Sequence, residues 1–213
     1  MLPILVHIGA QSKGKAGEPA ALVLAPTREL AMQTAEVAEK AGEACGIGCA
    51  CIYGGAPKGP QHAALRKGAQ IVVATPGRLK DLMQEGALSL GRATFLVLDE
   101  ADRMLDLGFE PEIRALAGAI RADRQTVMFS ATWPSSIQAL AREFLSEPVM
   151  VRIGAEGTRA SHSITQIVEV IDAAARDARL EQLLMQYQGD KASTRRCIIF
   201  VLYKKEVCAA LLA

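Results

Sequence analysis

The sequence has few of the residues that mark secreted, membrane-spanning or metal-binding proteins. It contains three histidines and an odd number of cysteines without C-x-x-C spacing, which are Cys45, Cys49, Cys51, Cys197 and Cys208. This pattern predicts buried thiols in a reducing compartment rather than a zinc site or a disulfide framework. No apolar run approaches the roughly 18 residues needed to span a bilayer, and the N-terminal stretch lacks the basic segment of a signal peptide. We therefore expect an intracellular protein with no membrane partner.

An excess of charge of one sign is also absent. Lys and Arg number 24 against 23 Asp and Glu, which gives a net charge of +1, and aromatic residues make up 4% of the chain. This balance argues against a uniformly basic nucleic-acid-binding protein, although it leaves room for a local basic groove, because net charge averages over faces that differ. With 213 residues, half of them hydrophobic, the chain is long enough for one domain and part of another.

Short, nearly continuous apolar runs alternate with longer helical patterns. Strands are predicted at 20–26, 49–53, 70–75, 94–99, 125–131 and 149–153. Helices are predicted at 27–44, 59–68, 77–86, 110–121 and 135–147. Within the first helix, the three- and four-residue spacing of Leu30, Thr34, Val37 and Ala41 predicts its apolar face. The alternation is typical of an α/β fold, a parallel sheet with helices on both faces.

A segment without periodicity, 154–163, is rich in Gly, Ser and charge and is predicted to be a linker between a first domain, 1–153, and a second region, 164–213. The second region begins with a predicted strand at 164–172, a helix at 175–188 and a strand at 196–202. We therefore expect the start of a second α/β unit.

Two adjacent carboxylates follow the apolar run at 95–98. Asp99 and Glu100 are predicted to lie at the carboxyl end of a buried strand, where open α/β sheets bind ligands. In an enzyme that hydrolyses nucleotides, a strand-end aspartate holds Mg²⁺ and a neighbouring glutamate positions or deprotonates the attacking water. A capped strand-to-helix turn would explain Asp99 or Asp102 alone, but explains the whole D-E-A-D run poorly.

The sequence D-E-A-D at 99–102, within VLDEADRMLDLGFEPEI (97–113), resembles the name-giving motif of the DEAD-box RNA helicases. Further segments resemble motifs of this family and occur in the family's order: APTRELAMQ (25–33), the pair Gly54–Gly55, TPGRL (75–79), SAT (130–132) and CIIFV (197–201). The resemblance covers essentially the whole chain, and the SATWP and MLDLGFEP segments favour the branch around the p68-like RNA helicases. It implies a RecA-like first domain followed by the start of a second.

By this resemblance, the parent protein couples ATP hydrolysis to RNA unwinding and remodelling of ribonucleoproteins in the nucleus or the cytoplasm, with ATP and Mg²⁺ as cofactors. Asp99 would contact Mg²⁺ through water and, with Glu100, the nucleotide, and Glu100 would activate the attacking water. Asp102, Ser130 and Thr132 would couple the nucleotide state to RNA binding. Proteins of ribonucleoprotein complexes are further candidate partners.

Helix N-termini offer N–H groups and a favourable dipole to phosphates, and a pair of glycines lets a phosphodiester approach the main chain closely. The residues expected to bind RNA follow predicted strands, where these features occur. They are Pro26, Thr27, Arg28, Gly54, Gly55, Thr75, Pro76, Gly77 and Arg78. Such contacts would be to the RNA backbone and independent of base sequence. Taken singly, each has an alternative: the glycines as a tight turn, the prolines as helix starts, and Arg78 as a solvated charge.

One further segment imitates a phosphate-binding loop. Residues 9–16 read G-x-x-x-x-G-K-A, one residue short of the P-loop pattern. A working P-loop needs a helix directly after it, but only about four residues separate Lys15 from the next predicted strand, which is too few for a parallel crossover. Ala16 also lacks the hydroxyl that would bind Mg²⁺. We expect a surface loop, and the resemblance implies that residues 1–8 form the helix before it.

The resemblance therefore implies a partial chain, without the family's Q motif, its P-loop and most of the second RecA-like domain. We expect little or no ATP hydrolysis by the 213-residue polypeptide alone. The alternative is a non-catalytic fragment that binds RNA or acts as a decoy by competing for RNA or partners. A DNA-directed helicase is disfavoured, because D-E-A-D together with PTREL and TPGR is typical of the RNA-directed family.

Overall fold

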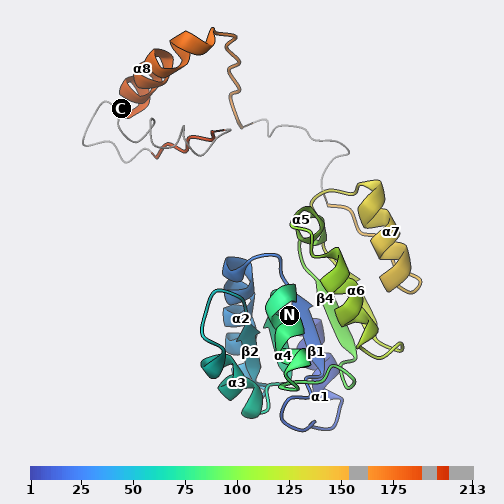
Figure 1. Cartoon of the computed structure of the whole chain (residues 1–213). Coiled ribbons are helices and arrows are strands. Elements are labelled where there is room, and N and C mark those ends of the chain that lie inside the picture. Colours follow the sequence, from blue (N-terminus) through green and yellow to red (C-terminus); the bar gives the residue numbers. More distant parts are fainter. Residues whose placement is uncertain (154–162, 189–195, 202–213) are drawn as a thin grey trace. The chain divides into compact units, whose positions relative to one another are not determined.

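The computed structural model describes residues 1–153, 163–188 and 196–201 (Figure 1). The chain divides into two units, Met1–Val151 and Arg152–Ala213. In the described part of the chain, no helix has both the length and the apolar character required to cross a membrane.

The first unit contains five parallel strands in the order β2-β3-β1-β4-β5. The strands are β1 (Ala21–Leu24), β2 (Cys49–Ile52), β3 (Ile71–Ala74), β4 (Phe95–Leu98) and β5 (Gln125–Met128). Every residue of the three inner strands is buried, as expected for continuous apolar runs covered on both faces. These five strands and the α/β class are as the sequence predicts.

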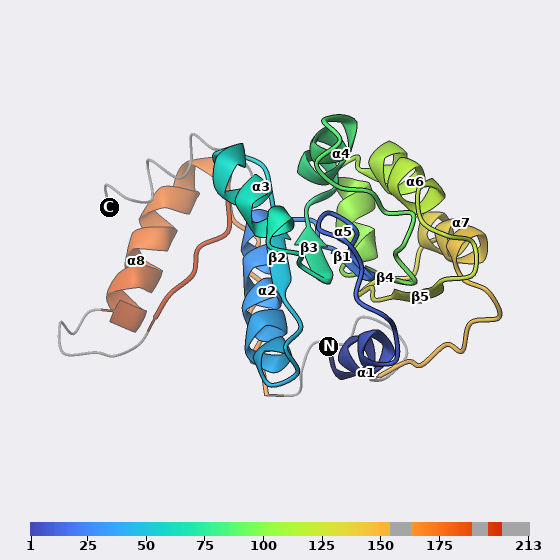
Figure 2. The same cartoon turned by 90° about the horizontal axis from the view of Figure 1, so that it is seen from below.

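Helices cover both faces of the sheet (Figure 2). The side chains of α1 (Leu2–Gly9) and α2 (Arg28–Glu43) pack on one face. The other face is covered by α3 (Lys58–Arg66), α4 (Pro76–Gln84), α5 (Ala101–Asp106), α6 (Glu110–Gly118) and α7 (Ser135–Phe144). All but α1 and the short α5 match helices predicted from periodicity alone, and α1 matches the helix that the family resemblance implied.

The predicted apolar face of α2 is wrong at Val37, whereas Leu30 and Ala41 are partly buried and pack against the core. The buried side is a stripe of small residues, Ala31, Ala35, Ala38 and Gly42, whereas Val37 is 56% exposed. A Cβ atom on Gly42 would lie 2.3 Å from the carbonyl oxygen of Ile47. Ile47 lies in the loop directly after α2, and its amide donates to the Gly42 carbonyl over 3.0 Å. A glycine at position 42 therefore leaves room for this loop to fold back on the end of the helix.

The loop at 9–16 follows the C-terminus of α1 and leads to β1, and no helix begins after Lys15. The Arg92 guanidinium donates a hydrogen bond to the Ser12 carbonyl, and the Ser89 amide donates to the Gly17 carbonyl over 2.8 Å. This segment therefore lies at the amino-terminal end of β1. It is the surface loop that the sequence predicts, and it has no helix N-terminus to bind a phosphate.

Three predicted strands are wrong within the described residues. Residues 149–153, 164–172 and 196–201 form no strand, and Ile153 is 95% exposed. Apolar runs become strands only where a neighbouring strand satisfies their backbone groups, and no partner strand is described for these. The predicted helix at 175–188 is confirmed as α8 (Arg176–Gln188), preceded by a 3-10 turn, η1 (Ala173–Ala175). Residues 154–162 of the predicted linker, and residue 202, lie outside the described residues.

Candidate nucleic-acid and nucleotide site

All the predicted site segments lie at one edge of the sheet. Because the five strands are parallel, their carboxyl ends meet at one edge, which we call the carboxyl edge. Its segments follow β2 (53–57), β3 (75–78), β1 (26–28), β4 (99–102) and β5 (130–132), in that spatial order. With strands about 4.8 Å apart, the RNA candidates occupy one half of the edge and the carboxylates the other.

Thr27 and Arg28 begin α2 above β1. The hydroxyl of Thr27 accepts a hydrogen bond from the Leu30 amide over 3.2 Å and caps the helix. The Arg28 guanidinium lies 5.0 Å from the centre of the Tyr53 ring, a distance at which the ring face attracts a cation. Arg28 remains exposed and is therefore both oriented and available to a phosphate. Sequence reasoning missed Tyr53, although an aromatic residue directly before two glycines was a usable signal.

The segment after β3 is tied to the segment after β2. The Thr75 amide donates to the Ile52 carbonyl over 2.8 Å. The Arg78 guanidinium donates from Nη1 to the Ala56 carbonyl over 2.9 Å. Arg78 therefore holds the neighbouring turn with one of its five N–H groups, a role that its prediction as an RNA contact did not include.

Pro26 and Pro76 are both buried. Pro26 precedes the Thr27 cap, and Pro76 is the first residue of α4. Proline lacks a backbone N–H, and its fixed φ angle suits the first turn of a helix. Pro76 therefore fits the helix-start interpretation, whereas Pro26 lies before the cap and outside α2. RNA contact by either proline stays a prediction.

At two glycines of this edge, neither the packing around the residue nor its φ angle requires a glycine. A Cβ atom added to Gly54 or Gly77 would meet no atom within 4 Å, and neither residue has a positive φ angle. Gly55 differs, because its φ of 74° favours glycine. The open space above Gly54 and Gly77 leaves their main chain accessible to a ligand, as contact with a sugar-phosphate backbone requires.

Asp99 and Glu100 follow β4. The Asp99 carboxyl is half-buried, which raises its pKa, and a hydrogen bond from the Glu100 backbone partly offsets this effect. Glu100 is exposed, and its backbone lies in the left-handed region, with φ 51° and ψ 54°. A non-glycine residue in this region carries strain of the kind found at functional sites.

The donor set at Asp99 fits a magnesium ion held through water. Carboxylate oxygens are hard ligands, and Mg²⁺ usually keeps several waters and binds one or two carboxylates together with substrate phosphates. In the described part of the chain, no group of three or more His, Cys, Asp or Glu residues could hold a metal ion, and no cation pairs with Asp99. A cation bound by Asp99 would stabilise the ionised carboxylate, which burial disfavours.

Asp102 is bound to the segment after β5. Its Oδ2 atom accepts two hydrogen bonds from Thr132, from the amide over 2.9 Å and from the hydroxyl over 2.7 Å. The Ser130 hydroxyl donates to the Thr132 carbonyl over 2.7 Å. Partial burial raises the pKa of Asp102, but the hydrogen bonds outweigh it and hold the pKa below its usual value. Thr132 therefore bonds directly to Asp102, and the Ser130 hydroxyl lies close enough to help lower its pKa. The coupling role of the three residues stays a prediction.

Comparisons with known proteins agree with this arrangement. A family model described as DEAD/DEAH box helicase matches residues 1–140. The chain is 51% identical over 209 residues to the DEAD-box ATP-dependent RNA helicase 5 of Oryza sativa subsp. japonica, covering 96% of this chain and 40% of the relative. It is also 51% identical over 205 residues to the ATP-dependent RNA helicase DBP2 of Scheffersomyces stipitis, covering 96% of this chain and 38% of the relative.

A solved structure is also similar. The crystal structure of a hypothetical ATP-dependent RNA helicase from Sulfolobus tokodaii matches with a TM-score of 0.60 and 35% identity, over 68% of this chain and 41% of that one. This match supports the predicted RecA-like fold. The chain spans about 40% of the length of these relatives.

Proposed function

Because the chain belongs to the DEAD/DEAH box helicase family, we propose that it is part of an ATP-dependent RNA helicase and provides one face of its RNA and nucleotide sites. The observation that carries this proposal is the placement of five motif segments at the carboxyl edge of one parallel sheet. The segments after β2, β3 and β1 would bind the RNA backbone, and those after β4 and β5 would act on the nucleotide.

Asp99 and Glu100 would have different tasks in hydrolysis. ATP, bound with Mg²⁺, would supply the phosphoanhydride bond that is broken. Asp99 would hold the ion through water, because its half-buried carboxylate has no cation partner among the residues that the structure describes. The exposed Glu100 would orient the attacking water and accept its proton. Thr132 and Asp102 would couple the nucleotide state to RNA binding.

Binding of RNA would depend on backbone contacts. Arg28 and the amides around Gly54 and Gly77 offer charge and hydrogen bonds of the kind that bind phosphates. We therefore expect affinity that is independent of sequence and falls with salt, with a slope of about −0.7 per phosphate contacted on a single strand. Remodelling of ribonucleoproteins inside the cell, with their proteins as partners, belongs to the same proposal.

The test is a titration of the 213-residue polypeptide with fluorescent single-stranded RNAs of different sequence at several salt concentrations. Similar affinities and a steep loss with salt are expected. Failure of every RNA to bind at low salt would overturn the proposal, and preference for one sequence would overturn the backbone mode of binding.

A second candidate, an RNA-binding fragment without catalysis, is favoured by the loop at 9–16, which offers no helix N-terminus to a nucleotide. The two candidates differ in their response to ATP and Mg²⁺. Under the second, the RNA affinity of the polypeptide is the same with and without the nucleotide, and no RNA-stimulated hydrolysis occurs. A nucleotide-dependent change in RNA affinity would exclude the second candidate.

A further inference from the structure

The glutamine at position 61 is buried beside the glycine turn at the carboxyl edge. Among the residues that the structure describes, Gln61 and Thr75 are the two buried polar or charged residues, and Gln61 is 6% exposed. It lies in α3, four residues after the Pro57 cap. Burying an amide is unfavourable unless it is hydrogen-bonded, so its contacts indicate what the residue does.

The Gln61 amide binds both ends of one turn. Its Oε1 accepts from the Tyr53 amide over 3.2 Å, and its Nε2 donates to the Tyr53 carbonyl over 3.1 Å. The same Nε2 also donates to the Pro57 carbonyl over 3.3 Å. Tyr53 directly follows β2 and Pro57 caps α3, so one side chain closes the turn 53–57, which we call the glycine turn.

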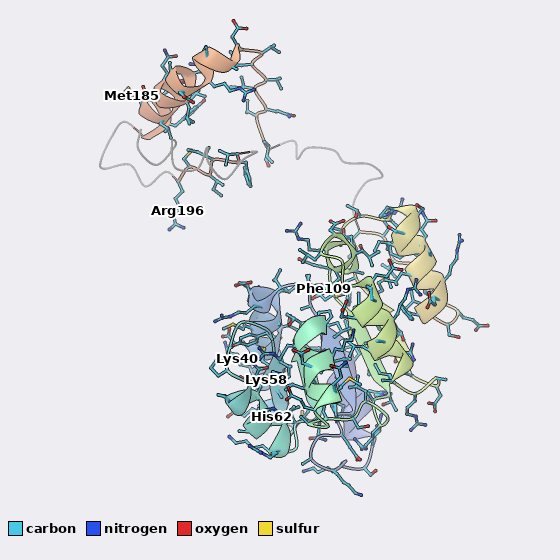
Figure 3. All side chains as sticks on the ribbon, in the orientation of Figure 1. Lys40, Lys58, His62, Phe109, Met185 and Arg196 are labelled. Atoms are coloured by element: carbon cyan, nitrogen blue, oxygen red, sulfur yellow. The ribbon has the colours of Figure 1, made fainter. Side chains whose placement is uncertain are left out.

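Other contacts fix the glycine turn and its surroundings. Arg78 binds the Ala56 carbonyl within the turn, and the Tyr53 ring lies against the Arg28 guanidinium. The α3 helix that carries Gln61 is itself tied to the end of α4, because Lys58 and His62 (Figure 3) both bind the Glu85 carboxylate. Gln61 therefore connects a fixed helix to the exposed Gly54 and Gly55.

We propose that Gln61 is a positioning residue for RNA binding, one that sets the conformation of the glycine turn and, through Tyr53, the position of Arg28. The inference rests on the proposed function. Two glycines in sequence lose more backbone entropy on ordering than any other pair. A turn already held in one conformation binds its ligand more tightly, because the ordering cost is not incurred on binding. Gln61 does this without touching the RNA.

The variant that tests this role is Gln61→Met, which keeps the length and volume of the side chain but removes all three hydrogen bonds. The matched control is Gln138→Met. Gln138 also follows a proline cap by four residues, Pro134 at the start of α7, and its Nε2 also donates to a backbone carbonyl, that of Trp133, over 3.3 Å. It has no contact with the glycine turn.

The measurements are the affinity for a single-stranded RNA and the hydrogen exchange of the Tyr53, Gly54 and Gly55 amides, both on the full 213-residue chain. We expect Gln61→Met to weaken RNA binding by about tenfold and to speed exchange in the glycine turn. Gln138→Met should change neither. Gln61→Glu keeps the acceptor but loses the donors at neutral pH, so its RNA affinity should recover, relative to the unsubstituted chain, when the substituted carboxyl is protonated.

Three other outcomes would contradict the positioning role. If the unsubstituted chain binds RNA and Gln61→Met is folded and binds equally well, the positioning role is wrong. If both Gln61 variants fail to fold while Gln138→Met folds, Gln61 serves folding and the positioning role is also wrong. If the unsubstituted chain binds no RNA, the proposed function fails, and the positioning role falls with it.

Discussion

Thr132 donates both of its hydrogen bonds to one oxygen of Asp102, from its amide over 2.9 Å and from its hydroxyl over 2.7 Å. The two residues are separated by β5 and α6 in sequence, and the contact joins the segments after β4 and β5. It stabilises the charged form of Asp102 and therefore makes this junction sensitive to acid.

The first prediction concerns the acid sensitivity of this junction. The folded pKa of Asp102 lies below its usual value, so its contribution to stability is complete above the unfolded pKa and is lost as the pH falls through the folded pKa. Thr132→Val removes the hydroxyl donor, so the Asp102 pKa should rise toward its ordinary value in an NMR titration of carboxyl carbons. Thr126→Val, on β5, is the control. An unchanged Asp102 pKa in Thr132→Val would show that the hydroxyl bond is not formed.

The second prediction concerns the opposite shift at Asp99. Its folded pKa is raised, because burial disfavours the charged form, so ionising Asp99 destabilises the fold as the pH rises past the unfolded pKa. Asp99→Asn should therefore raise the free energy of unfolding at neutral pH, and the gain should disappear below the ordinary aspartate pKa. Urea denaturation at both pH values measures this, with exposed Asp81→Asn as the control. A gain that is absent, or unaffected by pH, would contradict the burial argument.

The third prediction compares the two glycines of the glycine turn. Gly54→Ala meets no neighbouring atom and no unfavourable φ, so the free energy of unfolding should change by less than about 0.5 kcal/mol, while RNA affinity should fall because the added methyl group blocks the main chain. Gly55→Ala should cost about 1 kcal/mol of stability, since φ is positive there. Full RNA affinity in Gly54→Ala would mean that RNA does not approach this residue.

The fourth prediction concerns the loop that folds back on the end of α2 at Gly42. Gly42→Ala should destabilise the fold by about 1–3 kcal/mol, the usual cost of overpacking, because its methyl group would lie 2.3 Å from a backbone oxygen, the Ile47 carbonyl. Gly59→Ala, at an exposed position of α3 with no atom within 4 Å of the added Cβ, should instead stabilise the fold by about 0.5–1 kcal/mol. Thermal denaturation of both variants checks this, and equal stabilities would contradict the close contact between Gly42 and the Ile47 loop.

The sequence predicts the five strands of the sheet well, because each is a continuous apolar run between helical patterns. It places Val37 of α2 incorrectly on the buried face, because the buried stripe of Ala and Gly carries little hydrophobic signal beside such larger apolar residues. It also predicts strands at 149–153, 164–172 and 196–202, where apolar character is present but no strand is formed by the described residues.

The candidate site, like the fold, could be predicted only in part from the sequence. The positions of Asp99 and Arg28 follow from the strand ends, since parallel strands bring these ends to one edge. The contacts of Gln61 with Tyr53 and of Arg78 with Ala56 could not be predicted, because they depend on the path of a turn that has no periodic pattern. The long polar side chains of Gln61 and Arg78 therefore hold the glycine turn through contacts that the sequence motifs do not reveal.

The most direct test of the account is an NMR titration of the 213-residue chain with a single-stranded RNA, in which every backbone amide is followed. The account predicts that shifts gather at the carboxyl edge, at residues 27–28, 54–55 and 77–78, and that the loop at 9–16 is unaffected. Shifts gathered at the loop, or at the amino-terminal ends of the strands, would contradict the account.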